Sequence, residues 1–330
     1  MSPVELVFGA FAFADPTSFE GFEKQKEALD VLAAEGVTLI DTATVYGESE
    51  SVLGSLDAAK THAIDSKFPG AFGPAPATKE NIIKTAEDGL AKLKADHVLA
   101  PLKKLRSSRY EVYYLHAPDR NVPLETQLEA INTLYESGKF KRFGLSNYLA
   151  SEVEDVVRIA KENNWILPTV YQGNYSAIAR RAENELLPTL RKHGIQFYAY
   201  SPGAGGFLAK SVESLVQSDG GRWDPTTFVG GLYHKLYNRP ALVEGLRLWE
   251  TIAREAGVSG IELAYRWVIH NSGLRGEYGD KVVIGGRNLA QVKSTLALAK
   301  KGPLDGGVAR RIDEVWKIVE GESPLDNFNA

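Results

Sequence analysis

Short apolar segments alternate with longer amphipathic segments along most of the chain. Each short segment is mostly apolar over its whole length, which is typical of parallel strands buried on both faces. We therefore expect eight strands, at residues 7–13, 38–42, 62–66, 111–116, 141–145, 168–172, 196–200 and 281–284.

The amphipathic segments carry the end signals of helices. Thr78 precedes one helical pattern as an N-cap, and Pro123 lies in the first turn of another that ends at Gly138. Ser151 and Glu154 match a capping box. Strand–helix units of roughly 40 residues predict either a (β/α)8 barrel or an open, doubly wound sheet.

Two stretches interrupt this alternation. Residues 68–77 form a loop rich in proline and glycine after the third expected strand, and residues 203–239 form a longer segment after the seventh. Loops of this length in a compact domain usually bind a ligand or cover a site.

Composition excludes several kinds of chemistry. The chain of 330 residues has no cysteine, so disulfides, thiolate nucleophiles, zinc–thiolate sites and iron–sulfur clusters are excluded. The net charge of −4 and the lack of a basic tract argue against a nucleic-acid partner. The six histidines are scattered without ligand spacing, so we expect no metal.

The sequence also gives no sign of membrane association. The first residues lack the basic and apolar regions of a secretory signal, and no apolar run approaches the ~18 residues of a membrane-spanning helix. We expect a cytoplasmic protein with no membrane partner.

Polar and ionisable side chains lie at the ends of the expected strands. In a barrel, the carboxyl ends of parallel strands meet at one face, where barrel enzymes hold their active sites. Each side chain alone has an ordinary explanation as a cap, a turn or a satisfied core residue. Their recurrence indicates a site built from Asp41, Lys67, His116, Ser146, Asn147, Gln172, Tyr200, Ser201 and residues 285–287.

Taken together, these motifs resemble the aldo-keto reductase superfamily, and within it the aflatoxin-aldehyde-reductase-like branch. The motifs are DTATVYG, the lysine after the third strand, YLHAPD, GLSNY and YSPGAGG. The resemblance implies an α/β fold: a (β/α)8 TIM barrel with a long loop after strand 7 and an extra C-terminal helix. It also implies that residues 1–330 form a single domain.

The resemblance implies NADPH-dependent reduction of a small-molecule aldehyde or ketone. Tyr46 would donate the proton, and Lys67 would make that phenol more acidic by stabilising the phenolate. Asp41 would pair with Lys67, since a buried ammonium needs a counter-ion. His116 would orient and polarise the carbonyl.

The resemblance also implies cofactor and substrate contacts. Ser146, Asn147 and Gln172 would bind the nicotinamide carboxamide, and Tyr200 would stack on the ring. Contacts to the rest of NADPH would come from Ser201, Gly203, Gly206, Leu208, Arg222, Gly285, Arg287 and Gln291, with Arg287 at the 2′-phosphate. The substrate pocket would be lined by Phe11, Phe68 and Trp223.

Two features depart from the family pattern. Ser294 and Thr295 stand where relatives often carry the Glu-Asn pair that contacts adenine. The chain ends in SPLDNFNA, without the basic terminal residue that helps relatives hold acidic substrates. We therefore do not expect carboxylate-bearing aldehydes to be preferred.

Two other functions remain open at this stage. Lys67 at a strand end permits a Schiff-base aldolase. A non-catalytic, NADPH-binding ancillary subunit is the other alternative. Relatives include monomers and dimers, and the chain offers no obvious interface run, so a monomer or a homodimer is expected.

Overall fold

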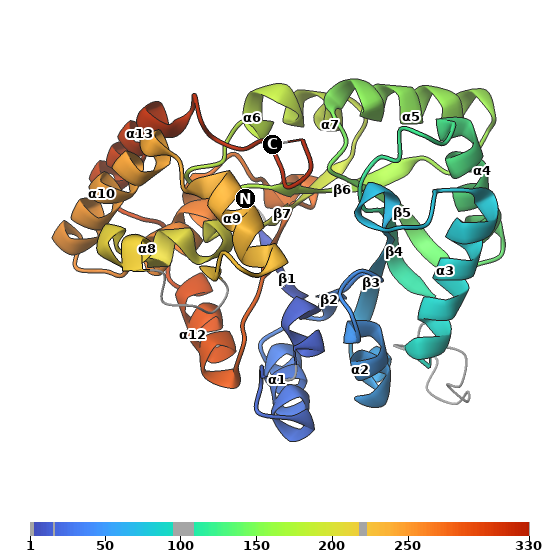
Figure 1. Cartoon of the computed structure of the whole chain (residues 1–330), viewed down its shortest axis with the longest axis horizontal. Coiled ribbons are helices and arrows are strands. Elements are labelled where there is room, and N and C mark those ends of the chain that lie inside the picture. Colours follow the sequence, from blue (N-terminus) through green and yellow to red (C-terminus); the bar gives the residue numbers. More distant parts are fainter. Residues whose placement is uncertain (1–2, 16, 95–108, 218–222, 330) are drawn as a thin grey trace.

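The computed structural model describes residues 3–15, 17–94, 109–217 and 223–329. Within these residues eight parallel strands follow one another around a closed barrel, with the last strand paired to the first (Figure 1). The strands are β1 (Glu5–Gly9), β2 (Leu39–Asp41), β3 (Ala63–Phe68), β4 (Tyr110–Leu115), β5 (Phe140–Ser146), β6 (Pro168–Asn174), β7 (Gln196–Tyr200) and β8 (Lys281–Ile284). Closure confirms the barrel and excludes the open sheet.

Helices surround the strands on the outside of the barrel (Figure 1). Their bounds are α1 (Phe22–Ala34), α2 (Ser49–Ser55), α3 (Lys79–Lys92), α4 (Leu124–Glu136), α5 (Ala150–Glu162), α6 (Ala182–Glu185), α7 (Leu187–Lys192), α8 (Val212–Gln217), α9 (Phe228–Tyr237), α10 (Pro240–Glu255), α11 (Gly260–Arg266), α12 (Leu289–Ala299) and α13 (Gly306–Val319). None of these helices is long and apolar enough to cross a membrane.

The expectation for the first strand is wrong in its bounds. Strand β1 ends at Gly9, and Ala10–Ala14 forms a short 3₁₀ helix instead of extended backbone. The apolar pattern continues past the strand because Phe13 turns inward and packs against Phe8 and Phe19. A buried 3₁₀ turn and a buried strand are equally apolar, so composition alone does not separate them.

The two expected helix caps have different outcomes. The Thr78 hydroxyl accepts a hydrogen bond from the Asn81 N–H, which confirms the cap of α3. The expected capping box of Ser151 and Glu154 is wrong, because α5 begins earlier and Glu152 accepts from the Leu149 N–H. Spacing alone favoured the wrong pair of residues within one helical turn.

The connection after β7 is folded rather than irregular. It includes the short helix Ala204–Ala209 and helices α8 and α9, followed by α10 and α11. The extra C-terminal helix α13 lies along α10 at one edge of the molecule (Figure 1). The chain beyond α13 then turns back toward the strands (Figure 1).

The interior of the barrel has an apolar layer below a polar one. Side chains alternate between the two sides of a strand, so positions two apart share a face. The apolar layer includes Val7, Leu39, Val112, Val170 and Val283. The same alternation directs Asp41, two residues beyond Leu39, into the barrel, where the polar groups collect.

Helices α2 and α3 approach closely at Gly54. A Cβ on Gly54 would lie 1.9 Å from the backbone oxygen of Lys92. We predict that Gly54→Ala lowers the free energy of unfolding by about 1–3 kcal/mol, because backbone must shift to admit the methyl group. Urea unfolding measures this. Ser55→Ala, on an exposed position of the same helix, is the control and should change it little. An unchanged Gly54→Ala midpoint would contradict the packing.

Candidate active site

Four ionisable side chains predicted from the sequence meet at the carboxyl ends of neighbouring strands. Asp41 ends β2, Lys67 lies near the end of β3 and His116 follows β4. Tyr46 lies in the turn after β2, where its N–H donates to the Ala43 carbonyl oxygen. The barrel thus brings together groups from three successive strand–helix units.

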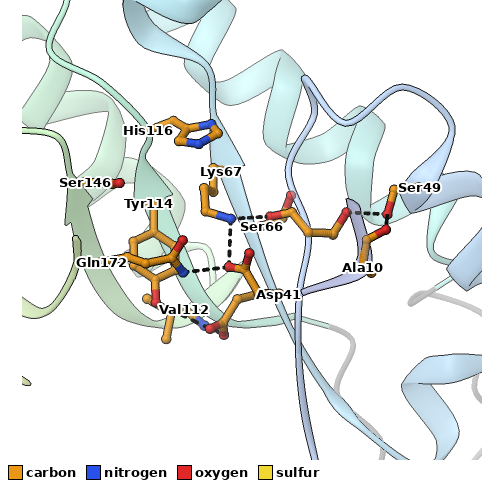
Figure 2. A network of polar contacts seen from close by, with 12 residues as sticks. Ala10, Asp41, Ser49, Ser66, Lys67, Val112, Tyr114, His116, Ser146 and Gln172 are labelled. Atoms are coloured by element: carbon orange, nitrogen blue, oxygen red, sulfur yellow. Dashed lines mark hydrogen bonds and ion pairs between the residues drawn. The ribbon is translucent and has the colours of Figure 1, made fainter. Parts of the chain in front are cut away.

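Lys67 is completely buried, and its ammonium is held by two oxygens. Its Nζ donates to Asp41 Oδ1 and to the Thr42 carbonyl oxygen, each at 2.7 Å (Figure 2). The side chain of Lys67 is 0% exposed and that of Asp41 is 3% exposed. Burial disfavours the charge, but the Asp41 carboxylate outweighs it and raises the pKa of Lys67 above its usual range. Lys67 is therefore a fixed cation.

Tyr46 lies against this cation. The Lys67 Nζ is 5.0 Å from the centre of the Tyr46 ring. Burial raises the pKa of Tyr46, and the Lys67 charge acts in the opposite direction. The Lys67 charge thus acts in the expected direction, but burial prevails in the net direction, and the role of Tyr46 as proton donor stays a prediction. The phenol keeps its proton at neutral pH.

His116 is a neutral base at the same end of the barrel. This end, where the carboxyl ends of the strands meet, is called the mouth. Its ring meets those of Tyr46 and Phe72 edge-on, with centroids 5.7 and 5.0 Å apart. Burial lowers the pKa of His116 well below its usual value, and the Lys67 charge lowers it further. Nδ1 is buried and has no hydrogen-bond partner. Because an unpaired acceptor is easier to bury here than an unpaired N–H, we assign the proton to Nε2.

A second carboxyl group, Asp65, lies behind the ion pair. It faces Asp41 in the register of β2 and β3, and it accepts from the Val112 N–H at 2.9 Å. The Tyr114 hydroxyl donates to its other oxygen at 3.4 Å. Burial, followed by the nearby Asp41 charge, raises the pKa of Asp65 well above its usual value. Lys67 therefore has one ionised carboxylate partner, Asp41.

Gln172 makes a hydrogen bond that the sequence did not predict. Its Nε2 donates to Asp41 Oδ1 at 2.8 Å, on the same oxygen that accepts from Lys67 (Figure 2). The side chain is buried, with 3% of the residue exposed. Gln172 therefore orients the carboxylate of the ion pair in this structure, and its contact with a nicotinamide stays a prediction.

Ser146, Asn147 and Tyr200 form a connected group beside His116. The Asn147 amide donates to the His116 carbonyl oxygen and to Ser146 Oγ. The Tyr200 hydroxyl donates to Asn147 Oδ1 at 2.9 Å. Asn147 has a φ of 61°, a left-handed conformation that asparagine adopts more readily than most residues. The structure thus brings together Ser146, Asn147 and Tyr200, which the family resemblance assigns to the nicotinamide.

The glycine-containing segment after β7 has an unusual backbone. Ser201 and Ala204 have φ values of 57° and 51°, and Gly206 has 94°. A Cβ on Gly206 would lie 3.8 Å from Trp223 Nε1, and the positive φ favours glycine at this position. Gly203 precedes the short helix, whereas the Leu208 side chain is buried at 1% exposure. A contact from Leu208 would therefore be made by its backbone.

The second expected cofactor region begins just after β8. A Cβ on Gly285 would meet no atom within 4 Å. Arg287 donates from its guanidinium to Asp15 at 3.2 Å, and its N–H donates to Gln291 Oε1. Arg287 thus already has a carboxylate partner, although 41% of its side chain is exposed. Arg222 lies outside the described residues.

Ser294 and Thr295, the two α12 residues that depart from the family pattern, differ in exposure. Ser294 is exposed, whereas Thr295 is 7% exposed and faces the core. Within the described part of the chain, only Ser294 of this pair presents its side chain to an adenine outside the helix.

The three expected pocket residues differ in how far their side chains are exposed. Phe11 is 40% exposed and meets the Tyr46 ring edge-on at 5.1 Å. Phe68 is 1% exposed, because it follows the inward-facing Lys67 and so points to the surrounding helices. Trp223 is 7% exposed and stacks on Tyr233. Of the three, Phe11 has the most exposed ring, and the pocket itself stays a prediction.

The Asp65 environment leads to a prediction about pH. Its folded-state pKa lies above the unfolded value near ~3.9, so its stabilising contribution is lost as pH rises through the folded-state pKa. We predict that Asp65→Asn raises the free energy of unfolding by about 1–3 kcal/mol at pH 7.5, and by less at pH 4.5. Urea unfolding at both pH values tests this.

The control for this experiment is Asp30→Asn, on an exposed position of α1. It should show no comparable pH dependence. An equal effect of Asp65→Asn at both pH values would mean that Asp65 is ionised in the folded protein.

Comparison with known proteins agrees with this geometry. The model of the Aldo/keto reductase family matches residues 5–317. An oxidoreductase, sirO, of Leptosphaeria maculans is 36% identical, with 97% of this chain and 95% of that protein covered. Aldo-keto reductase family 7 member A3 of Homo sapiens is 37% identical, covering 88% of this chain and 87% of that protein.

A third relative carries a more specific name. Aflatoxin B1 aldehyde reductase member 2 of Rattus norvegicus is 35% identical, with 88% of this chain and 79% of that protein covered. The family match over most of the chain, the closed barrel and the buried ion pair beside Tyr46 all lead to one assignment. The chain belongs to the aldo/keto reductase family and is an oxidoreductase that acts on carbonyl compounds.

Proposed function

We propose that the protein reduces an aldehyde or ketone to the alcohol, with NADPH as hydride donor and Tyr46 as proton donor. The observation that carries this proposal is the buried Asp41–Lys67 pair directly beside the Tyr46 ring. A fixed cation at that place stabilises the phenolate that remains after the proton has left. Likeness to relatives named as aldehyde reductases favours an aldehyde as the substrate.

The backbone at the barrel mouth fits a dinucleotide. Gly285 leaves open space where a side chain would stand, so a phosphate group can approach the main chain there. Arg287 lies just before α12, and 41% of its side chain is exposed, so a phosphate can reach its guanidinium. When bound, NADPH supplies the hydride for the carbonyl carbon.

Residues at the mouth would donate the proton, bind the carbonyl oxygen and hold the ion pair in place. The Tyr46 hydroxyl keeps its proton at neutral pH and can give it to the carbonyl oxygen as that oxygen gains negative charge. Neutral His116, with its proton on Nε2, donates a hydrogen bond to the same oxygen. Lys67 stays charged and bound to Asp41, while Gln172 keeps the carboxylate in place.

The same geometry disfavours an aldolase that uses Lys67. Schiff-base formation needs a neutral, accessible amine. The Lys67 ammonium is fully buried, donates to two oxygens and has a raised pKa. A covalent role for this lysine would require the ion pair to break inside the barrel.

We also propose that residues 1–330 act as one domain, since the site takes residues from β2 to beyond β8. We keep the cytoplasmic location and the monomeric or homodimeric state as proposals. Turnover of a carbonyl compound distinguishes a reductase from a non-catalytic NADPH-binding subunit.

We predict that Tyr46→Phe lowers kcat/KM for NADPH-dependent reduction of 4-nitrobenzaldehyde by about 10²–10⁴-fold, because the proton donor is lost. The affinity for NADPH should not change. NADPH oxidation followed by absorbance measures turnover. Tyr278→Phe, at a tyrosine that is 53% exposed, is the matched control. Turnover retained by Tyr46→Phe would exclude this mechanism, and a wild type that binds NADPH but reduces no carbonyl would favour the ancillary subunit.

A separate prediction concerns the 2′-phosphate. Arg287→Ala should weaken NADPH binding about 10-fold or more and leave NADH binding nearly unchanged, because a charge-assisted hydrogen bond to the phosphate is lost. Equilibrium titration of both cofactors measures this, with Arg254→Ala on α10 as an exposed control. Equal losses for the two cofactors would remove Arg287 from the phosphate site.

A further inference from the structure

The C-terminal tail, defined here as residues 323–329, is anchored on the barrel. The Ser323 hydroxyl donates to the Ile178 carbonyl oxygen at 2.9 Å. The buried Asp326 carboxylate accepts from the N–H groups of Phe328 and Asn329. These bonds fold the last residues into a compact turn at the mouth, so the tail has a defined conformation.

Two tail residues bond directly to the group around Tyr200. The Asn327 N–H donates to the Tyr200 hydroxyl oxygen at 3.2 Å. The Asn329 side-chain amide donates to the Asn147 carbonyl oxygen at 3.0 Å. Because the Tyr200 hydroxyl itself donates to Asn147 Oδ1, these bonds tie the tail to both residues at once.

These bonds act on atoms that would otherwise be free to move. Without Asn327, the Tyr200 hydroxyl keeps one partner, Asn147 Oδ1, and the ring loses a restraint at its outer end. Asn147 already holds a left-handed backbone through its bonds to His116 and Ser146. The bond from Asn329 adds a restraint on the carbonyl side of the same residue.

We propose that Asn327 and Asn329 are positioning residues for the nicotinamide, so that the C-terminal tail forms part of the cofactor site. This inference rests on the proposed function, in which Tyr200 stacks on the nicotinamide and Asn147 binds its carboxamide. Fixing both residues before the cofactor arrives reduces the conformational entropy lost on binding. The expected consequence is higher affinity for the cofactor.

The tail also reaches the carbonyl side of the mouth, and the two roles can be separated. The Phe328 ring meets Phe72 edge-on at 5.6 Å, and Phe72 in turn meets His116. A tail that acted only through this aromatic contact would change the KM for the carbonyl. A tail that positions Tyr200 and Asn147 changes the dissociation constant of the cofactor in the absence of any carbonyl.

The first experiment removes one N–H group from the tail. Asn327→Pro lacks the backbone donor to Tyr200, whereas the matched control Asn327→Ala keeps it. We expect Asn327→Pro to bind NADPH about 3- to 10-fold more weakly than Asn327→Ala, the effect of one neutral hydrogen bond. Quenching of tryptophan fluorescence by NADPH, without carbonyl substrate, gives the dissociation constant.

Two further variants test the tail at other positions, although Asn329→Ala also removes the bonds of that side chain to Asp326 and Arg120. Asn329→Ala removes the bond to Asn147 and should also weaken NADPH binding about 3- to 10-fold. Phe328→Leu keeps both backbone and amide bonds and should leave the dissociation constant of NADPH unchanged. In a Tyr200→Phe background the hydroxyl is absent, so Asn327→Pro should have no additional effect.

The outcomes are distinct. NADPH affinity equal to wild type in both Asn327→Pro and Asn329→Ala overturns the inference and leaves the proposed function standing. An equal loss from Asn327→Pro with and without the Tyr200 hydroxyl also overturns it, because the effect would not pass through that bond. Wild-type protein that does not bind NADPH overturns the proposed function first.

Discussion

A lysine ammonium without exposed surface lies inside the barrel, and much of the site depends on how it is paired. Lys67 can remain charged there because Asp41 and the Thr42 carbonyl oxygen both accept from it. Removing one partner of a buried pair typically costs about 3–5 kcal/mol, because the other charge is left uncompensated. The register of β2 and β3, which sets Asp41 beside the inward face of β3, is therefore a condition for the site to exist.

Burial and the charges of this pair together set the protonation of its neighbours. At Asp65 burial and the Asp41 charge raise the pKa, and together they outweigh the Lys67 charge, which lowers it. The Lys67 charge also favours neutral His116 over the imidazolium. At Tyr46 burial and the Lys67 charge act in opposite directions. Burial thus leaves a neutral imidazole and a protonated phenol at the same mouth, and the Lys67 charge supports the first and opposes the second.

The fold and the central residues could be predicted because they rest on local patterns. Apolar segments at regular intervals indicated either a barrel or an open sheet, the family resemblance favoured the barrel, and strand-end positions indicated Asp41, Lys67 and His116. The hydrogen-bond partner of a side chain can lie far away in the sequence. Gln172 and Asp41 are 131 positions apart, so no local pattern predicted the bond between them. Asp65 did leave one, since it stands two residues before Lys67 and strand alternation puts both on one face.

The tail could not be predicted for the same reason. The sequence DNFNA is polar and short, and nothing in it specifies that Asn327 will meet Tyr200 or that Asn329 will meet Asn147. Carboxylate-bearing aldehydes were not the expected substrates.

The structure adds a physical argument to that expectation. Arg120, which contacts the tail by donating to Asn329, also donates to the Glu152 carboxylate at 2.7 Å. Lys67 is likewise bound to Asp41. Because each of these two cations already has a carboxylate partner, a carboxylate on the substrate would have to compete with it. The aromatic rings of Phe11, Phe72 and Phe328 meanwhile offer apolar surface at the same mouth. The balance of charge and apolar surface at this mouth therefore favours a neutral carbonyl compound over an acidic one.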